Sequence, residues 1–198
     1  MDAKIEHSDL LFGVFDTCAL DPSVAILQDE MSSFGNSNMQ SLPKEHTAAL
    51  PIVALYQPDI PGNTGTILRS AACLGMQVHI IEPAGFRIDD KSLLRAGMDY
   101  LDMAQLHRHD DWDAFCSWCL AEERRLILLT TKSEKSYTDF AFDAKDCLLF
   151  GRESAGVPES VHEYCAERLT IPIAIPGRSL NLAVSVAMVA GEAIRQLG

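Results

Sequence analysis

The chain has 198 residues, 47% of them hydrophobic, and a formal net charge of −12 at pH 7. This length is typical of one domain with a short extension, and the hydrophobic content is sufficient for a sizeable core. The negative charge counts against a nonspecific nucleic-acid binder, which needs a basic face, and no apolar run approaches the roughly 18 residues of a membrane span.

The first fifty residues differ in character from the rest of the chain. Residues 1–48 contain eight acidic and two basic residues, which is the wrong charge for a signal or transit peptide. Short apolar stretches there alternate with a polar stretch rich in Ser, Gly and Asn. We therefore expect an acidic, flexible extension over 1–50, a folded domain over 51–198, and a cytoplasmic protein. Met31 or Met39 as the true start of translation is an open alternative.

Apolar runs alternate with helical patterns from residue 51 onward. Short apolar runs bounded by turn residues predict strands at 52–56, 78–81, 126–130, 147–150 and 169–175. Apolar residues spaced three and four apart predict helices at 63–74, 91–97, 110–122, 158–164 and 180–197. This alternation predicts an α/β fold with a parallel sheet and helices on both of its faces.

The six cysteines include one pair, Cys116 and Cys119, with the spacing of a metal or redox site. The pair falls in a predicted helix, whose apolar stripe consists of Trp112, Phe115, Cys119 and Leu120. No second Cys-x-x-Cys or Cys-x-x-His accompanies it, as a zinc site would require. We therefore expect these cysteines to pack in the core and expect no metal.

Open parallel sheets bind ligands beyond the carboxyl ends of their strands, and residues 63–69 are the first segment at such a position. Asn63 is placed to cap the following helix, Gly65 allows close backbone approach, and Arg69 lies further along. The amides of a helix start bind anions. The segment is neither a P-loop nor a dinucleotide fingerprint, and an ordinary helix start is the alternative.

A second segment, residues 149–158, runs from a strand through two glycines to a proline. Gly151 at the strand end suits a place where a ligand lies against bare backbone. Arg152 and Glu153 follow it, and a surface ion pair of little energetic value is the alternative interpretation.

A third segment, residues 171–182, is an apolar run stiffened by Pro172 and Pro176. Two prolines exclude a regular central strand. The segment brings Ser179 and Asn181 to the start of an apolar helix. A helix cap explains either residue alone, but it does not explain the whole string.

Together and in this order, the three segments resemble the SPOUT superfamily of S-adenosylmethionine-dependent RNA methyltransferases, in the branch that methylates ribose 2′-hydroxyls. Further stretches are similar to the subfamily that modifies the wobble cytidine or uridine of tRNA. These stretches are LYQPDIPGNTG at 55–65, IIEP at 80–83, DDK at 89–91, RAGMDY at 95–100 and LTTK at 129–132. The resemblance covers about residues 52–197. Ala183 and Gly191 depart from residues common in relatives.

The resemblance implies a fold that no spacing argument proposes, a C-terminal trefoil knot that holds S-adenosylmethionine. It also implies a homodimer that acts on the tRNA anticodon stem-loop, at the ribose of nucleotide 34, without metal or membrane. The cofactor contacts that it implies are Leu129, Gly151, Ile171 and Ser179. The catalytic set that it implies is Arg69, Glu153, Ser179 and Asn181, with the last three holding Arg69 and the knot loop in place.

A local cluster of polar and basic residues must bind RNA if the acidic chain does so. The candidates are Asn63, Lys91, Arg95, Arg152 and Arg178. The alternatives within the family are a 2′-O-methyltransferase for another tRNA or ribosomal RNA site and a non-catalytic RNA-binding member. Outside it, the pattern alone also fits a nucleotide- or flavin-binding α/β protein.

Overall fold

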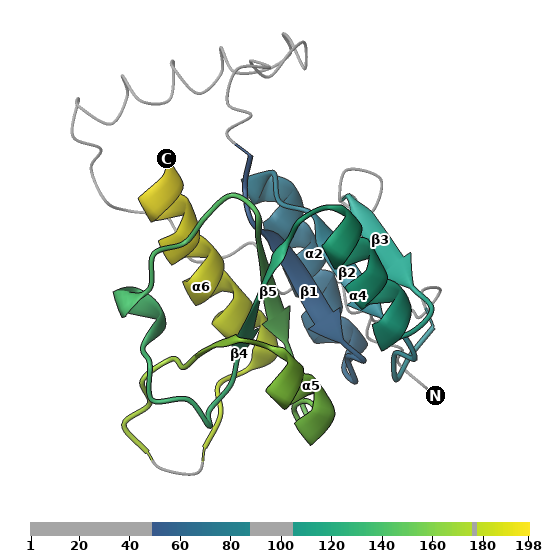
Figure 1. Cartoon of the computed structure of the whole chain (residues 1–198). Helices are drawn as coiled ribbons and strands as arrows, with labels where there is room; N and C mark the ends of the chain where they lie inside the picture. The colour runs from purple at the N-terminus through teal and green to yellow at the C-terminus, as the bar shows by residue number, and fades with distance from the viewer. Residues whose placement is uncertain (1–48, 88–104, 176–177) are drawn as a thin grey trace, which may run out of the picture. The chain divides into compact units, whose positions relative to one another are not determined.

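The structure is a computed structural model that describes residues 49–87, 105–175 and 178–198. Within these residues, six parallel strands form one sheet in the order β3-β2-β1-β5-β4-β6. The strands are β1 (Ile52–Tyr56), β2 (Val78–Ile81), β3 (Leu106–His109), β4 (Arg125–Leu129), β5 (Asp146–Phe150) and β6 (Glu167–Leu169). β1 and β5 are adjacent at the centre, where strands from the first and second halves of the chain meet (Figure 1).

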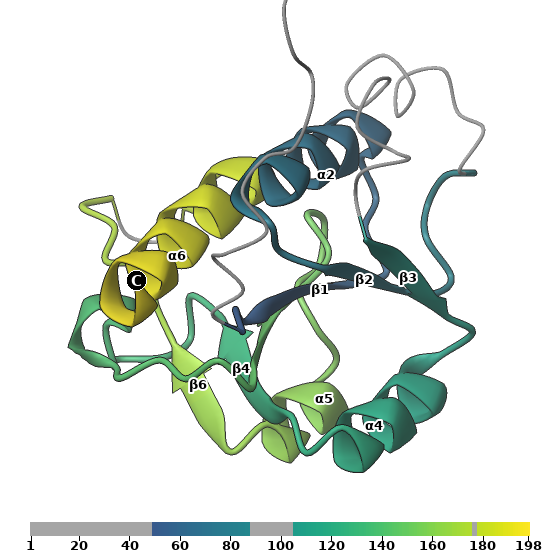
Figure 2. The same ribbon diagram turned by 90° about the horizontal axis from the view of Figure 1, so that it is seen from above.

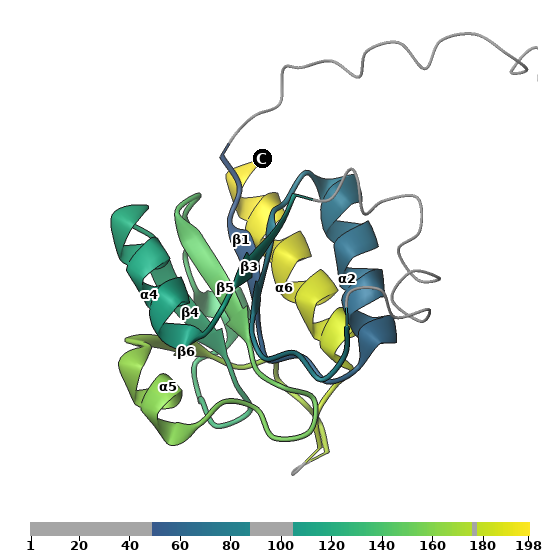
Figure 3. The same ribbon diagram turned by 90° about the vertical axis from the view of Figure 1, so that its right-hand side faces the viewer.

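Helices cover both faces of the sheet, as Figures 2 and 3 show. α2 (Pro61–Leu74) and α6 (Leu182–Leu197) lie on one face, and α4 (Trp112–Ala121) and α5 (Glu159–Tyr164) lie on the other. A short 3₁₀ helix, η1 (Tyr137–Asp139), lies in the β4–β5 connection. β1 is buried along its whole length because alternate side chains enter the two cores. The predicted parallel sheet with helices on both faces is confirmed.

Two strand predictions failed. The strand predicted at 169–175 ends at Leu169 and begins earlier, at Glu167. Pro172 has no N–H for a strand ladder and disfavours helix at Ile171, so the chain leaves the sheet after Thr170. β3 was not predicted, because its sequence Leu-His-Arg-His lacks an apolar run and belongs to an edge of the sheet. The helix predicted at 91–97 lies outside the described residues.

α2 begins two residues earlier than predicted. Pro61 occupies its first turn, where a missing N–H costs nothing, and Ile60 is the N-cap without a side-chain hydrogen bond. Gly75 ends the helix with φ 72°, a left-handed conformation that glycine adopts without strain. The predicted capping role of Asn63 is therefore wrong. Asn63 lies inside the first turn, and its side chain makes tertiary contacts instead.

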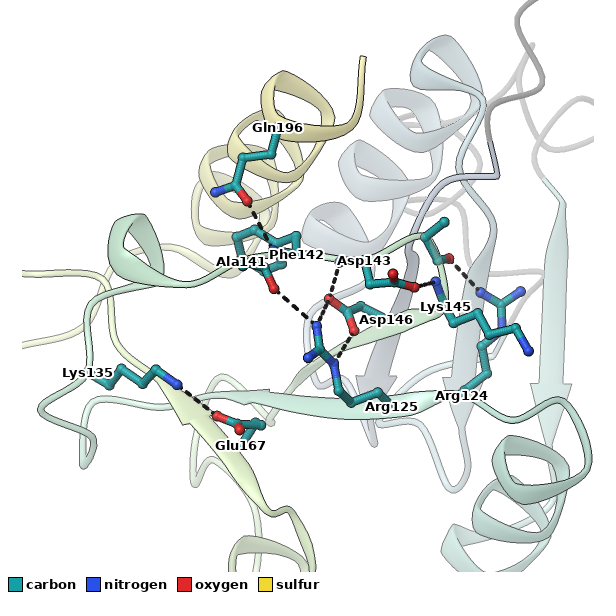
Figure 4. Close-up of polar contacts among 11 residues, drawn as sticks. Arg124, Arg125, Lys135, Ala141, Phe142, Asp143, Lys145, Asp146, Glu167 and Gln196 are labelled. Carbon is teal, nitrogen blue, oxygen red and sulfur yellow. Dashed lines mark hydrogen bonds and ion pairs between the residues drawn. The ribbon is translucent and has the colours of Figure 1, made fainter.

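A polar network fastens the amino ends of β4 and β5 to the carboxyl end of α6 (Figure 4). Asp146 is fully buried and accepts hydrogen bonds from Arg125 Nε at 2.6 Å and Nη2 at 2.9 Å. Gln196 on α6 accepts from the backbone N–H of Phe142 and donates to the carbonyl of Phe140, both at 3.0 Å. These hydrogen bonds join the amino ends of β4 and β5 to the carboxyl end of α6 through the β4–β5 connection.

A buried histidine pair joins β2 to the edge strand β3. The ring of His79 is fully buried, and its Nδ1 lies 2.8 Å from Nε2 of His109. The Trp118 ring of α4 covers it at a centroid distance of 4.2 Å. Burial, followed by the neighbouring His107 and His109, lowers the pKa of His79 to about 3. His79 is therefore neutral at physiological pH.

Candidate functional site

A cavity of about 860 Å³ lies at the carboxyl ends of β4, β5 and β6. Its walls come from the segments that follow these strands, from the segment before α6, and from the start of α2. All three segments that the sequence singled out contribute to it, although they are far apart along the chain. This is the position where open parallel sheets bind ligands.

Most of the predicted site residues line this cavity. They are Leu129, Gly151, Ile171 and Ser179 among the cofactor candidates, and Asn63, Arg152, Glu153, Arg178 and Asn181 among the others. Arg69 is exposed on α2, roughly 9 Å further along the helix axis than Asn63. Lys91 and Arg95 lie outside the described residues.

Gly151 is needed for a tight loop. The backbone N–H groups of Arg152 and Gly156 each donate to the other's carbonyl at 2.9 Å, and Gly156 has φ 68°. A Cβ on Gly151 would lie 2.5 to 2.9 Å from backbone atoms of Gly156. The close approach that the sequence predicted at Gly151 is therefore made by the loop's own backbone.

Asn63 connects the three segments. Its Nδ2 donates to Glu153 Oε1 at 3.1 Å, and its Oδ1 accepts from Asn181 Nδ2 at 2.9 Å. Asn181 Oδ1 in turn accepts from the N–H groups of Ala183 and Val184, at 2.9 and 3.3 Å. Because those backbone donors fix the orientation of the Asn181 amide, they also fix the Asn63 amide. The first turn of α2, the loop after β5 and the start of α6 thus share one set of hydrogen bonds.

Asn181 is also the N-cap of α6. Its side chain satisfies two of the backbone donors that a helix start leaves unpaired. A capping function for this residue, which the sequence left open, is therefore present together with the contact to Asn63. Asn63 forms hydrogen bonds with both Glu153 and Asn181.

Asp59 was not predicted as a site residue, yet it makes several contacts beside the cavity. Arg152 donates to Asp59 Oδ1 through Nη2 at 2.7 Å and Nε at 3.2 Å. Ser154 donates to Oδ2 from its backbone N–H, at 3.1 Å, and from its hydroxyl. The hydrogen bond from Arg152, followed by that from Ser154, lowers the pKa of Asp59 to about 2. In the sequence, an aspartate between two prolines indicates only a turn.

The basic residues around the cavity are partly neutralised by acidic neighbours. Lys132 Nζ lies 3.2 Å from Glu159 Oε2, and Arg152 pairs with Asp59. Arg178 is exposed at the cavity. Of the basic residues at the cavity, Lys132 and Arg152 are therefore paired with carboxylates.

Of the cysteine pair, Cys119 belongs to the core on the α4 and α5 face, whereas Cys116 does not. Cys119 is buried and Cys116 is half-buried, and burial raises the pKa of Cys116 to about 11. Among the described residues, no group of His, Cys, Asp and Glu side chains could hold a metal ion. Leu120, expected on the same apolar stripe, is 80% exposed. No helix in the described part of the chain is long and apolar enough to cross a membrane.

The fold and the cavity define an α/β protein with a candidate ligand site at the carboxyl ends of β4, β5 and β6. The start of α2, which follows β1, forms part of the wall of this site. Comparison with protein families places it more closely. Residues 51–191 match the SpoU rRNA Methylase family, and the chain belongs to that family.

Individual relatives cover the same region. A tRNA (cytidine(34)-2′-O)-methyltransferase of Beijerinckia indica is 57% identical over 147 residues, which are 74% of this chain and 92% of the relative. The Escherichia coli K12 protein of the same name is 41% identical over 148 residues, covering 74% and 93%.

Solved structures agree with this placement. One, described as giving insights into 2-OH methylation of C/U34 on tRNA, matches with a TM-score of 0.72 at 42% identity, over 75% of this chain and 97% of its own. An AdoMet-bound rRNA methyltransferase from Sinorhizobium meliloti matches with a TM-score of 0.69 at 26% identity, over 75% and 57%.

Proposed function

We propose that this chain is a cytoplasmic S-adenosylmethionine-dependent methyltransferase that modifies the ribose 2′-hydroxyl of nucleotide 34 in tRNA. The observation that carries the proposal is the cavity whose wall includes the hydrogen-bonded residues Glu153, Asn63 and Asn181, in a domain 57% identical to a relative named for that reaction. This similarity does not rest on a single motif, because it extends over 147 residues.

The cavity suits S-adenosylmethionine in size and chemistry. Its volume of about 860 Å³ lies within the range of about 300–1,000 Å³ typical of cofactor sites. Apolar side chains such as Leu129 and Ile171 line it beside the narrow backbone loop at Gly151. We assign Leu129, Gly151, Ile171 and Ser179 to cofactor binding. When bound, the cofactor supplies an electrophilic methyl group.

The chain's own residues must orient the ribose and assist loss of its proton. Arg69 is assigned to the RNA phosphate next to the reacting hydroxyl. A guanidinium resists deprotonation, so a role as general base is disfavoured. It stabilises negative charge that develops on the 2′-oxygen. Glu153 and Asn181, joined through Asn63, hold the cavity walls in register, and such positioning is a large part of catalysis.

A homodimer is the proposed assembly. Val184 and Met188 are 48% and 38% exposed, and their spacing of four places them on one side of α6. Leu180, which precedes the helix, is 39% exposed. A row of exposed apolar residues on a helix is typical of an interaction surface. We expect Val184→Glu to convert a dimer to a monomer in analytical ultracentrifugation, and Leu120→Glu, a control on α4, to leave the dimer intact. A wild-type monomer would contradict this assignment.

We further propose that the segment after β6 forms the trefoil knot of related enzymes and that the catalytic domain is 51–198. Residues 1–50 are then an extension that methyl transfer does not require. Limited proteolysis of the full chain is expected to remove this extension first and to leave methyl transfer unchanged. Loss of activity upon that cleavage would assign the extension a function.

Transfer of labelled methyl groups to RNA tests the proposed function. Intact tRNA is expected to accept label, and the same tRNA without its anticodon stem-loop is not. Labelling of the truncated tRNA would favour another tRNA position. Labelling of ribosomal RNA instead would favour the alternative substrate that the family's name suggests.

A further inference from the structure

Arg152 occupies a fixed orientation beside the cavity. It follows β5 and lines the cavity wall. Its Nη2 and Nε both donate to Asp59 Oδ1, and Nη1 lies 3.4 Å from Gln57 Oε1. Gln57 itself has a positive φ of 45°, an uncommon conformation for a residue with a side chain. Gln57 and Asp59, which follow β1, therefore hold the guanidinium of Arg152, which follows β5.

The guanidinium keeps donors for a further ligand. An arginine carries five N–H groups in a planar fork, and these contacts engage one each on Nε, Nη1 and Nη2. One hydrogen on Nη1 and one on Nη2 are not used by these contacts. The side chain is 37% exposed, so part of it is accessible to a ligand at the cavity. Two parallel N–H donors match the oxygens of a phosphate.

Asp59 also anchors the loop that carries Arg152. Its Oδ2 accepts from Ser154, and its own backbone N–H donates to Glu153 Oε2 at 2.8 Å. Gly85 lies against its backbone. One carboxylate thus fixes both the backbone and the side chain of the 152–154 stretch.

We propose that Asp59 is a positioning residue that presents the unused N–H donors of Arg152 to a phosphate of the RNA substrate. The inference rests on the proposed function, because it assumes RNA at this cavity. Holding the side chain beforehand removes most of the conformational entropy that a free arginine loses on binding. Asp59 therefore favours RNA binding although its own charge repels phosphate.

Positioning of Arg152 and charge repulsion by Asp59 predict opposite changes in RNA affinity when Asp59 is replaced by alanine. Full-length protein and a labelled anticodon stem-loop are used, with affinity measured over a series of salt concentrations. We expect Asp59→Ala to weaken binding about tenfold, the loss of one oriented charge contact. We also expect the slope of log affinity against log salt to become shallower by about 0.7, one phosphate contact on a single strand. Unchanged or tighter binding by Asp59→Ala would overturn the proposal, because a carboxylate that merely repels phosphate gives that result.

A double-mutant cycle tests whether Asp59 acts through Arg152. Asp59→Ala is expected to add less than about twofold in the Arg152→Ala background, since the two residues share one contact. Independent, additive losses would overturn the proposal. Asp59→Asn retains an acceptor for Arg152 and is expected to bind RNA more tightly than Asp59→Ala does. Arg152→Lys keeps the positive charge but lacks the planar fork of donors, and it is expected to bind RNA as weakly as Arg152→Ala.

Two controls separate this idea from misfolding and from failure of the proposed function. S-adenosylmethionine affinity by calorimetry is expected to change less than about threefold in Asp59→Ala. An equal loss of cofactor and RNA binding in that variant would indicate a collapsed loop and overturn the positioning role. Lys145→Ala removes an exposed ion pair with Glu123 at the far end of the sheet and is expected to bind like wild type. If wild type itself neither binds nor methylates the stem-loop, the proposed function fails; if only the Asp59 effects are absent, this inference alone fails.

Discussion

Exchange of the donor and acceptor between Asn63 and Glu153 is the most specific perturbation of the site. Asn63→Asp replaces the Nδ2 donor with an oxygen that faces the Glu153 carboxylate, where the present distance is 3.1 Å. Two carboxylates at that distance repel each other. Asn63→Ala loses the same hydrogen bond without adding repulsion. We therefore expect Asn63→Asp to be the more damaging single change.

The magnitude follows from the two contacts of Asn63. A hydrogen bond to a charged group contributes about 1.5–3 kcal/mol and a neutral one about 0.5–1.5. Asn63 is half-buried and Asn181 exposed, so the lower ends apply. Asn63→Ala is expected to lower the free energy of unfolding by about 2 kcal/mol, measured by urea denaturation, and to weaken S-adenosylmethionine binding in calorimetry.

The rescue variant decides whether the hydrogen bonds act as described. In Asn63→Asp combined with Glu153→Gln, the new amide donates to the new carboxylate, and its oxygen still accepts from Asp59 N–H. The contact from Asn181 is kept as well. Most of the lost stability and cofactor affinity is expected to return. A double variant as damaged as the sum of both single variants would refute the reasoning.

Two further predictions concern backbone space and protonation. Gly151→Ala is expected to lower the free energy of unfolding by about 1–3 kcal/mol through overpacking against Gly156, and to weaken cofactor binding. Gly191→Ala, a helical glycine with open space around its Cβ position, is its control and is expected to stabilise by about 0.5–1 kcal/mol; equal thermal shifts would contradict the packing argument. For His79, the pKa of about 3 in the folded state lies below the unfolded value of about 6.5, so its neutral form stabilises the fold above pH 6.5 and that stability is lost as pH falls toward 3. The loss is up to about 1.4 kcal/mol per pH unit. His79→Gln is expected to make the slope of unfolding free energy against pH shallower in urea denaturation from pH 7 to 5. Equal slopes for the two proteins would contradict the assignment of this pH dependence to His79.

The elements with strong apolar patterns were predictable from the sequence. β1, β2 and β5 are buried on both faces, so their apolar runs were unambiguous. β3 lies at the sheet edge with two exposed residues in its middle, and it left no such pattern. The position of β6 depended on where Pro172 forces the chain out of the sheet, which the pattern indicated only approximately.

The site was predictable in its segments but not in its connections. Gly151, Glu153 and Asn181 were named because their segments follow strands and resemble a family. Their actual contacts depend on tertiary placement, which brings Asn63 within hydrogen-bond distance of residues 90 and 118 positions away. Asp59 carried no sequence signal beyond a turn, since its importance comes from Arg152 and Ser154, which are 93 and 95 positions away.

Methyl transfer to a synthetic anticodon stem-loop that differs at one atom tests the central claim most directly. One RNA carries the natural ribose at nucleotide 34 and the other a 2′-deoxyribose there, with labelled S-adenosylmethionine as donor. Methylation of the natural RNA, mapped to the 2′-oxygen of nucleotide 34, and none of the deoxy RNA is the predicted result. Equal labelling of both RNAs would contradict the account.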